Sequence, residues 1–293
     1  MARASSRPVS IGRYDAGAWV ATGDEIAAEE PLQLLLDGEP LSVIMRTPGN
    51  DIELALGLLH AERVITTLDD VASLRISVEA DEREDRIPVS SDLLESNAID
   101  VRLRTTATRR PRRSFLSSSA CGVCGATTMD DLAHDHAPLA PGPVVDATVL
   151  PPLADRLRER QQLFERTGGL HAAGLFTAAG ELITLREDIG RHNAVDKVVG
   201  RAVLDRRVPL GSTLLAVSGR AGYEVVQKAV AAGIPMLVAV GAPSTLAVAT
   251  ALRFGLTLVG FLRGERFNVY SRPERVRGAR IVDATGVPSP SRG

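Results

Sequence analysis

The chemistry of this sequence centres on two cysteines in the segment SSSACGVCGATT. Cys121 and Cys124 are the only cysteines among 293 residues, so the chain is not a disulfide scaffold. Glycine and serine flank them, which is typical of an accessible loop, and the preceding run RLRTTATRRPRR favours the thiolate form. Such a pair can bind a metal, exchange disulfides, or act as a nucleophile that carries sulfur.

Each of these chemistries makes a different demand on the rest of the sequence. Zinc needs two further ligands, and His134 with His136 stand nearby. The base-deaminase signature is matched poorly, because its H-x-E would be His60 to Glu62 and alanine precedes Cys121. A thioredoxin-like redox site expects a strand directly before the cysteines, and serines stand there. A carrier thiolate, which attacks a sulfur donor and holds the sulfur as a persulfide, needs only an exposed loop.

The composition predicts a soluble protein of about two domains. Hydrophobic residues make up 44 % and charged residues 24 %, and a net charge of −2 gives no reason to expect nucleic acid as a partner. The N-terminus has no apolar signal-peptide core. The stretch TLAVATALRFGLTLVGFL is long enough for a membrane span, but Arg253 would cost about 3 kcal/mol there and Gly255 divides it into a helix and a strand. We expect a cytoplasmic protein with no membrane partner.

The first half of the chain predicts a small α+β domain over residues 30–113, preceded by a loose segment at 1–29. LQLLLDGEPLSVIMRT indicates two strands around an Asp37-Gly38 turn. NDIELALGLLHAERVI indicates a helix with Asn50 as N-cap and Glu53 completing a capping box. LRISVEA and AIDVRLRT indicate further strands. The arginine-rich run after them indicates an exposed linker.

The second half predicts a larger α/β domain over residues 114–270, with a loose tail at 271–293. PLADRLRERQQLFERTGG predicts a helix, LHAAGLFTAAGELITLRE predicts a hairpin, and strands then alternate with helices, which favours a largely parallel sheet covered on both faces. Ligands bind such sheets beyond the carboxyl ends of the strands. The turns EDIGRHN, SGRAGYE and GAPST fall there, and we expect each to offer free N–H groups to a phosphate.

Several segments together resemble the FdhD/NarQ family, in order from Glu30 to Tyr270. They are EEPLQLLLDGEPLSVIMRTPGNDIELALGLL near the N-terminus, and then SACGVCG, TGGLHAAGLF, EDIGRHNAVDKVVG, SGRAGYEVVQKA, AGIPMLVAVGAPSTLAVA and GLTLVGFLRGERFNVY. The resemblance implies a sulfur carrier (a sulfurtransferase) that matures formate dehydrogenase. Such a carrier takes sulfur from a cysteine desulfurase and passes it to molybdenum bound by two molybdopterin guanine dinucleotides. It also implies a homodimer and a cytidine-deaminase-like fold for the C-terminal domain, without the deaminase zinc.

The resemblance also assigns roles to residues. Cys121 would form the persulfide, with Cys124 beside it. The cofactor-binding set would comprise Arg220, His192 and the FLRGER segment: Phe261, Leu262, Arg263, Gly264, Glu265 and Arg266. A guanine nucleotide such as GDP is expected at the same place.

Some assignments keep alternatives. Phe261 would otherwise be a core strand residue, and His192 a hydrogen-bonded loop histidine. Gly222 and Gly241 stand where the family often has serine, so the ligand contacts of those two turns stay open. The alternatives to a sulfur carrier are a cofactor-binding chaperone without sulfur transfer and a zinc-dependent hydrolase.

Overall fold

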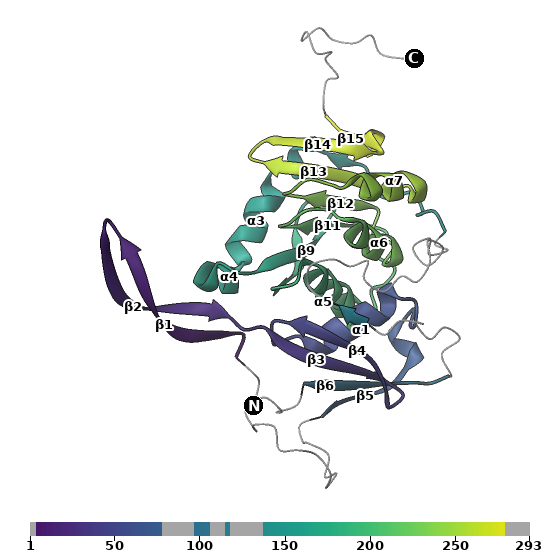
Figure 1. Cartoon of the computed structure of the whole chain (residues 1–293). Helices are drawn as coiled ribbons and strands as arrows, with labels where there is room; N and C mark the ends of the chain where they lie inside the picture. The colour runs from purple at the N-terminus through teal and green to yellow at the C-terminus, as the bar shows by residue number, and fades with distance from the viewer. Residues whose placement is uncertain (1–3, 78–96, 106–114, 118–136, 279–293) are drawn as a thin grey trace.

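The structure is a computed structural model that describes residues 4–77, 97–105, 115–117 and 137–278. The fold is mixed α/β, with a larger sheet, a smaller sheet and a projecting hairpin (Figure 1). The two cysteines lie outside the described residues.

The larger sheet has six strands in the order β10-β9-β11-β12-β13-β14. Their bounds are β9 His171–Thr177, β10 Leu182–Asp188, β11 Thr213–Val217, β12 Met236–Ala239, β13 Thr257–Arg263 and β14 Arg266–Ser271. The predicted parallel arrangement is confirmed for β11, β12 and β13, while β9, β10 and β14 run antiparallel to their neighbours.

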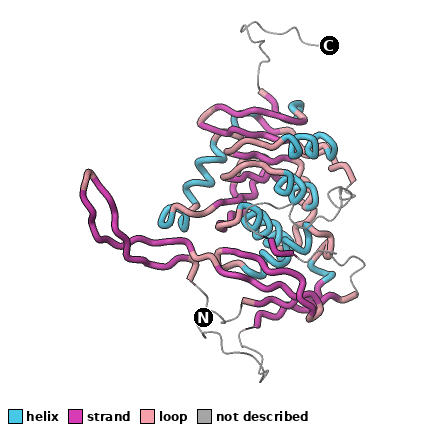
Figure 2. Tube along the Cα trace, viewed as in Figure 1, coloured by secondary structure: helices cyan, strands magenta, loops and turns pink. Residues whose placement is uncertain are grey.

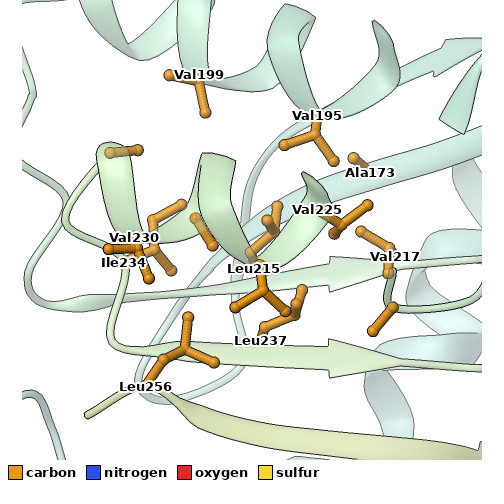
Figure 3. Close-up of a cluster of buried hydrophobic side chains, with 14 of the residues drawn as sticks. Ala173, Val195, Val199, Leu215, Val217, Val225, Val230, Ile234, Leu237 and Leu256 are labelled. Atoms are coloured by element: carbon orange, nitrogen blue, oxygen red, sulfur yellow. The ribbon is translucent and has the colours of Figure 1, made fainter. Parts of the chain in front are cut away.

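Helices cover both faces of this sheet, as the alternation predicts (Figure 2). On one face lie α5 Arg191–Leu204, α6 Tyr223–Ala231 and α7 Thr245–Phe254; on the other lies α3 Pro152–Arg160, which a short helix α4 Gln162–Thr167 follows. Successive residues of a strand point in turn to the two helical layers. Leu215 packs in the core under α5 to α7 (Figure 3), whereas Leu214 packs with Leu153 of α3. The strands are therefore apolar at successive positions because both faces are buried.

The smaller sheet has the order β5-β6-β3-β4-β7. Its elements are β3 Glu30–Leu36, β4 Glu39–Arg46, α1 Asp51–Ala61, η1 Leu68–Asp70, β5 Val71–Ser77, β6 Ala98–Leu103 and β7 Phe115–Ser117. Asp37 and Gly38 both have positive φ, as a two-residue hairpin turn requires. β7 pairs with β4, so this sheet continues past the predicted boundary at residue 113.

Two glycines let α1 lie directly against α5. A Cβ atom added at Gly57 would lie 1.9 Å from the carbonyl oxygen of Asp196, and one added at Gly200 would lie 1.7 Å from that of Glu53. No side chain fits at such distances. The smaller unit is therefore held to the larger one by backbone contact between two helices.

The prediction of a loose segment at residues 1–29 is wrong. β1 Ser6–Asp15 and β2 Ala18–Ala27 form an antiparallel hairpin that projects from the body (Figure 1). Most of its residues are exposed on both faces, so the sequence has no apolar alternation to reveal the strands. The turn residues Ala16 and Gly17 both have positive φ, which is the geometry of a tight hairpin.

Three further predictions need correction. Asn50 precedes α1 in a left-handed conformation without a side-chain cap, and Glu53 binds Arg186 instead of completing a capping box. The helix predicted over PLADRLRERQQLFERTGG breaks at Gln161 into α3 and α4. The segment predicted as a loose tail begins with regular structure: after η4 Pro273–Arg275, β15 Val276–Arg277 pairs with β8 Val145–Asp146, which η3 Ala147–Val149 follows. Packing partners distant in sequence decide each of these outcomes.

None of the helices in the described ranges has the length and apolar run that a membrane crossing requires. The stretch that could have spanned a membrane by length is α7 followed by β13, with Gly255 in the left-handed region between them. This division confirms the prediction made from Gly255.

Candidate functional site

The candidate site is the edge of the larger sheet where β11, β12 and β13 end. The turns that follow these strands are joined by backbone hydrogen bonds. Gly241 N–H donates to the carbonyl of Gly219 at 3.0 Å, and Phe261 N–H donates to the carbonyl of Gly241 at 3.1 Å. The hairpin of β9 and β10 brings His171 and Asp188 to the same edge, because β9 runs antiparallel to β11 and begins there, while β10 runs antiparallel to β9 and ends there.

Phe261 is held in a conformation that is rare for a bulky residue. Its φ is 54°, it lies where the register of β13 and β14 shifts, and its side chain is 40 % exposed. Leu262 is buried beside it. A strained, exposed aromatic residue argues against the alternative of a core strand residue and favours a surface that meets a ligand.

The rest of the FLRGER segment forms the turn between β13 and β14. Arg263 and Arg266 face each other across this turn, and Gly264 takes a φ of 53° between them. Both arginines are exposed, as is Glu265. The two guanidinium groups are therefore available to an anionic ligand at the outer end of the edge.

His192 lies at the other end of the edge, as the second residue of α5. Its Nδ1 is 3.2 Å from Oε2 of Glu224. Burial lowers the pKa of His192 to about 3, and the positive charges of Lys228 and Arg191 act in the same direction. The imidazole is therefore neutral near pH 7.

A buried ion pair supports this end of the site. Lys228 Nζ donates to both carboxylate oxygens of Asp196, at 2.8 and 2.9 Å, and lies 3.5 Å from Oε1 of Glu224. Burial raises the pKa of Asp196 and of Glu224, while Lys228 acts against it in both. Two short bonds from one ammonium to both oxygens fit a charged pair, since a carboxylate accepts at both.

Sequence reasoning gave His171 no role, yet the structure places it in the site. Its Nδ1 would be 3.3 Å from a Cβ atom added at Gly219. Burial lowers the pKa of His171, and Arg191 and Arg220 contribute in the same direction although Asp188 opposes them. The signal was the position of this histidine at the second residue of the predicted hairpin, whose start and end share one sheet edge. Arg220 is exposed in the turn after β11.

The prediction that all three turns offer free N–H groups is wrong for several donors. Ile189 N–H donates to Thr47 Oγ1 at 3.1 Å and Gly190 N–H to Asp188 Oδ1 at 2.8 Å. Gly241 and Ser244 N–H bind the carbonyls of Gly219 and Ala221. The turns use these groups to bind one another, so the exposed arginine side chains are the better candidates for phosphate contacts.

The two glycines that depart from the family pattern differ in their surroundings. A Cβ atom added at Gly222 would have nothing within 4 Å, whereas one at Gly241 would lie 2.9 Å from the carbonyl oxygen of Gly219. A serine would therefore fit at position 222. At position 241 it would require the turn to move.

Cys121 and Cys124 lie outside the described residues, as do Arg109, Arg110, Arg112, Arg113, His134 and His136. The described chain reaches the cysteines from β7, which runs parallel to β4 with Ser117 level with Ile44. β4 leads on to Thr47, whose N–H donates to Asp188 at the site edge. β7, the last described strand before the cysteines, thus points towards the edge that carries His192. The described ranges contain no group of three or more residues suited to hold a metal ion.

Comparison with known proteins identifies the family. The model of the FdhD/NarQ family matches residues 27–277. This chain belongs to the FdhD/NarQ family. Its FdhD/NarQ relatives include the sulfur carrier protein FdhD of Nocardia farcinica, 50 % identical over 256 residues that cover 87 % of this chain and 88 % of the relative. The protein of the same name from Streptomyces coelicolor is 45 % identical over 283 residues, covering 94 % and 97 %.

The fold of this FdhD/NarQ member also has a solved counterpart. The crystal structure of a candidate formate dehydrogenase accessory protein from Desulfotalea psychrophila superposes with a TM-score of 0.73 at 24 % identity, covering 94 % of this chain and all of that one. At this identity the likeness concerns the fold.

Proposed function

We propose that this chain is a sulfur carrier that supplies the sulfur formate dehydrogenase needs for activity. The observation that carries the proposal is 50 % identity, over 87 % of the chain, with a protein named sulfur carrier protein FdhD. The structure supports it with one sheet edge along which His192, His171, Arg220 and the FLRGER turn lie. The sequence supplies a reactive thiol pair in Cys121 and Cys124.

Loading is a transfer between thiols. The Cys121 thiolate attacks the terminal sulfur of the persulfide on a cysteine desulfurase, and a new S–S bond forms on Cys121. The S–S bond of the donor breaks, and its cysteine leaves as a thiolate. No net oxidation or reduction occurs, since one persulfide replaces another.

Delivery requires two electrons, because the persulfide sulfur must leave as sulfide. The Cys124 thiolate can supply them by attacking the Sγ atom of Cys121, which forms a Cys121–Cys124 disulfide and releases sulfide to the molybdenum of the substrate cofactor. A dithiol reductant then restores both thiols. This scheme gives the second cysteine a resolving role.

The exposed side chains along the edge suit the chemistry of the cargo, molybdenum with two molybdopterin guanine dinucleotides. Arg220, Arg263 and Arg266 are exposed cations for its phosphates, and Phe261 offers a ring face. GDP is a convenient probe of the same site. Calorimetry should show that GDP binds more tightly than ADP, and equal or absent binding of both would contradict a guanine-specific site.

The deciding experiment is intact-mass analysis after incubation with a cysteine desulfurase and cysteine. We expect an adduct of one sulfur atom that maps to Cys121, disappears on reduction with dithiothreitol, and is absent from Cys121→Ala. Cofactor binding without any sulfur adduct would support a chaperone instead. Stoichiometric zinc in the purified protein would support a hydrolase.

The arginine run before the cysteines is the proposed docking site for the desulfurase. Arg109, Arg110, Arg112 and Arg113 together form a dense positive charge. Replacing all four with serine should slow persulfide loading and leave GDP affinity unchanged. The effect on loading should be largest at low salt, since the Debye length falls to about 8 Å at physiological ionic strength and charge pairs at the surface are then screened. A wild-type loading rate at every salt concentration would show that these arginines are only a solvated spacer.

A further inference from the structure

Thr47 joins the smaller unit to the ligand edge through every polar group it has. It follows β4 and is 1 % exposed. Its N–H donates to Asp188 Oδ2 at 3.2 Å, its Oγ1 accepts from Ile189 N–H at 3.1 Å, and its carbonyl accepts from Lys197 Nζ at 2.8 Å. All three partners belong to the larger unit, between the end of β10 and the second turn of α5.

The partners of Thr47 are themselves fixed by buried polar contacts. Lys197 Nζ lies 2.7 Å from Asp188 Oδ2, and both side chains are buried. Asp188 Oδ1 also accepts from Gly190 N–H at 2.8 Å and from Asn193 Nδ2 at 2.9 Å. Asn193 Nδ2 in addition donates to the carbonyl of Met45, at the end of β4. The polar side chains of Thr47, Asp188, Asn193 and Lys197 therefore all have hydrogen-bond partners, which is the condition for a rigid buried network.

This network gives a structural role to those polar residues of the EDIGRHNAVDK run that are not exposed at the ligand edge. Asp188, Asn193 and Lys197 all bind the end of β4 or one another, whereas Arg191 and His192 lie between them on the same turn. Asp188, Asn193 and Lys197 therefore fix the conformation of the turn, and Arg191 and His192 are the residues that the turn places at the edge.

We propose that Thr47 is a positioning residue for the ligand edge: its hydroxyl fixes the 188–193 turn and so sets the position of His192 and Arg191. The inference rests on the proposed function, since it assigns Thr47 a part in binding the cofactor at that edge. Thr47 also follows the strand that pairs with β7, the last described strand before the cysteines. Thr47 therefore connects β4, which pairs with β7, to the 188–193 turn.

The sharpest variant is Thr47→Val, which keeps the shape and the backbone contacts but removes the acceptor of Ile189 N–H. Thr47→Ser keeps that acceptor and is the rescue variant. Thr213→Val is the matched control, because Thr213 is also buried and its hydroxyl is also bonded, to the carbonyl of Leu210 at 2.9 Å, at the start of β11 away from the edge. The readouts are amide hydrogen exchange across residues 188–193, GDP affinity by calorimetry, and persulfide loading of Cys121.

We expect Thr47→Val to speed exchange in the 188–193 turn and to weaken GDP binding about tenfold, because the half-buried N–H of Ile189 loses its acceptor. Persulfide loading should be unchanged. Thr47→Ser should restore both affected readouts, and Thr213→Val should alter neither.

The proposal would be overturned if Thr47→Val left both the amide hydrogen exchange of residues 188–193 and the affinity for GDP unchanged. An equal loss of affinity in Thr213→Val, or a failure of serine to rescue, would also overturn it, since either would indicate a general effect on the fold. If GDP binds no variant, the wild type included, the proposed cofactor site is wrong. Faster turn exchange in Thr47→Val, rescued by serine, then still supports the positioning role, and unchanged exchange overturns it.

Discussion

The amide of Phe261 donates a hydrogen bond to the carbonyl of Gly241 at 3.1 Å, and Phe261 keeps a φ of 54° where this bond is made. The contact joins the turn after β12 to the bulge in β13. Gly260 beside it has no room for a side chain, because an added Cβ atom would lie 2.9 Å from Pro243 Cδ. The backbone that carries the exposed ring of Phe261 is therefore held in place by Gly241 and Pro243.

Phe261→Gly should cost little stability and should weaken nucleotide binding. Glycine adopts a positive φ without the penalty of about 1 kcal/mol that other residues carry, and the ring it removes is exposed. Urea denaturation should place the variant within about 1 kcal/mol of the wild type, while calorimetry shows a reduced affinity for GDP. A loss of several kcal/mol would instead indicate a core residue, for which removal costs about 3–5 kcal/mol.

Cys121→Ala should abolish formate dehydrogenase maturation without affecting the fold. The measurement is enzyme activity in a cell that carries only the variant, together with a thermal melt that should match the wild type. Cys124→Ala should still load sulfur but deliver it slowly, because the resolving thiol is missing. Full enzyme activity with Cys121→Ala would contradict the carrier mechanism.

Gly222→Ser and Gly241→Ser should differ in stability. Serine at position 222 enters open space at the N-cap of α6, where its hydroxyl can accept from the helix and change stability by only a few tenths of a kcal/mol. Serine at position 241 meets the carbonyl of Gly219, so we expect a loss of about 1–3 kcal/mol. Thermal melts of the two variants test this, and equal melting temperatures would contradict the geometry of the turn.

The neutral His192 should make the protein sensitive to acid. Its pKa is about 3 in the folded chain against an ordinary value of 6.5, so between these values the unfolded chain binds more protons at this residue. The free energy of unfolding therefore falls as the pH drops from 6.5 towards 3, with a slope of up to about 1.4 kcal/mol per pH unit.

His192→Asn should flatten that dependence, as measured by urea denaturation at several pH values. The groups around His192, namely Glu224, Lys228, Arg191 and His171, are the same in both proteins, so the difference between the two slopes isolates the imidazole. Equal slopes would mean that His192 is not held neutral by the fold.

Replacing Lys228 alone should lower the free energy of unfolding far more than replacing Lys228 and Asp196 together. Lys228→Met leaves the buried carboxylate of Asp196 without its cation, which costs about 3–5 kcal/mol. Adding Asp196→Leu should recover much of that loss, because the apolar pair needs no compensating charge. A double variant no more stable than Lys228→Met would show that the pair is not coupled.

Local patterns in the sequence predicted much of the framework. Asp37-Gly38 predicted a hairpin because two residues with positive φ match the twist of paired strands, and Gly255 predicted the division between α7 and β13. The strands β11 and β12 were predicted as apolar segments that alternate with helices, and the turns after them were placed at the carboxyl edge. These features depend on neighbours within a few residues, so sequence patterns are informative about them.

The hairpin of β1 and β2 lacks such a pattern. Strands exposed on both faces have no reason to alternate between apolar and polar residues, so only the turn at Ala16 and Gly17 carried a signal. The capping box expected from Asn50 and Glu53 failed for a different reason. Arg186, which is 133 residues away in sequence, binds the Glu53 carboxylate and leaves it unavailable to the helix start.

The sequence by itself therefore determined the order and type of the main elements, the sheet edge at which the three predicted turns gather, and the resemblance that comparison confirmed. Only the tertiary structure decided which polar residues act together. The chain has two lysines, and both are buried: Lys197 beside Asp188 and the carbonyl of Thr47, and Lys228 between Asp196 and Glu224. A charged side chain can be buried only where opposite charges and carbonyls converge on it. That convergence is set by how α1, α5 and α6 pack, which no local pattern contains.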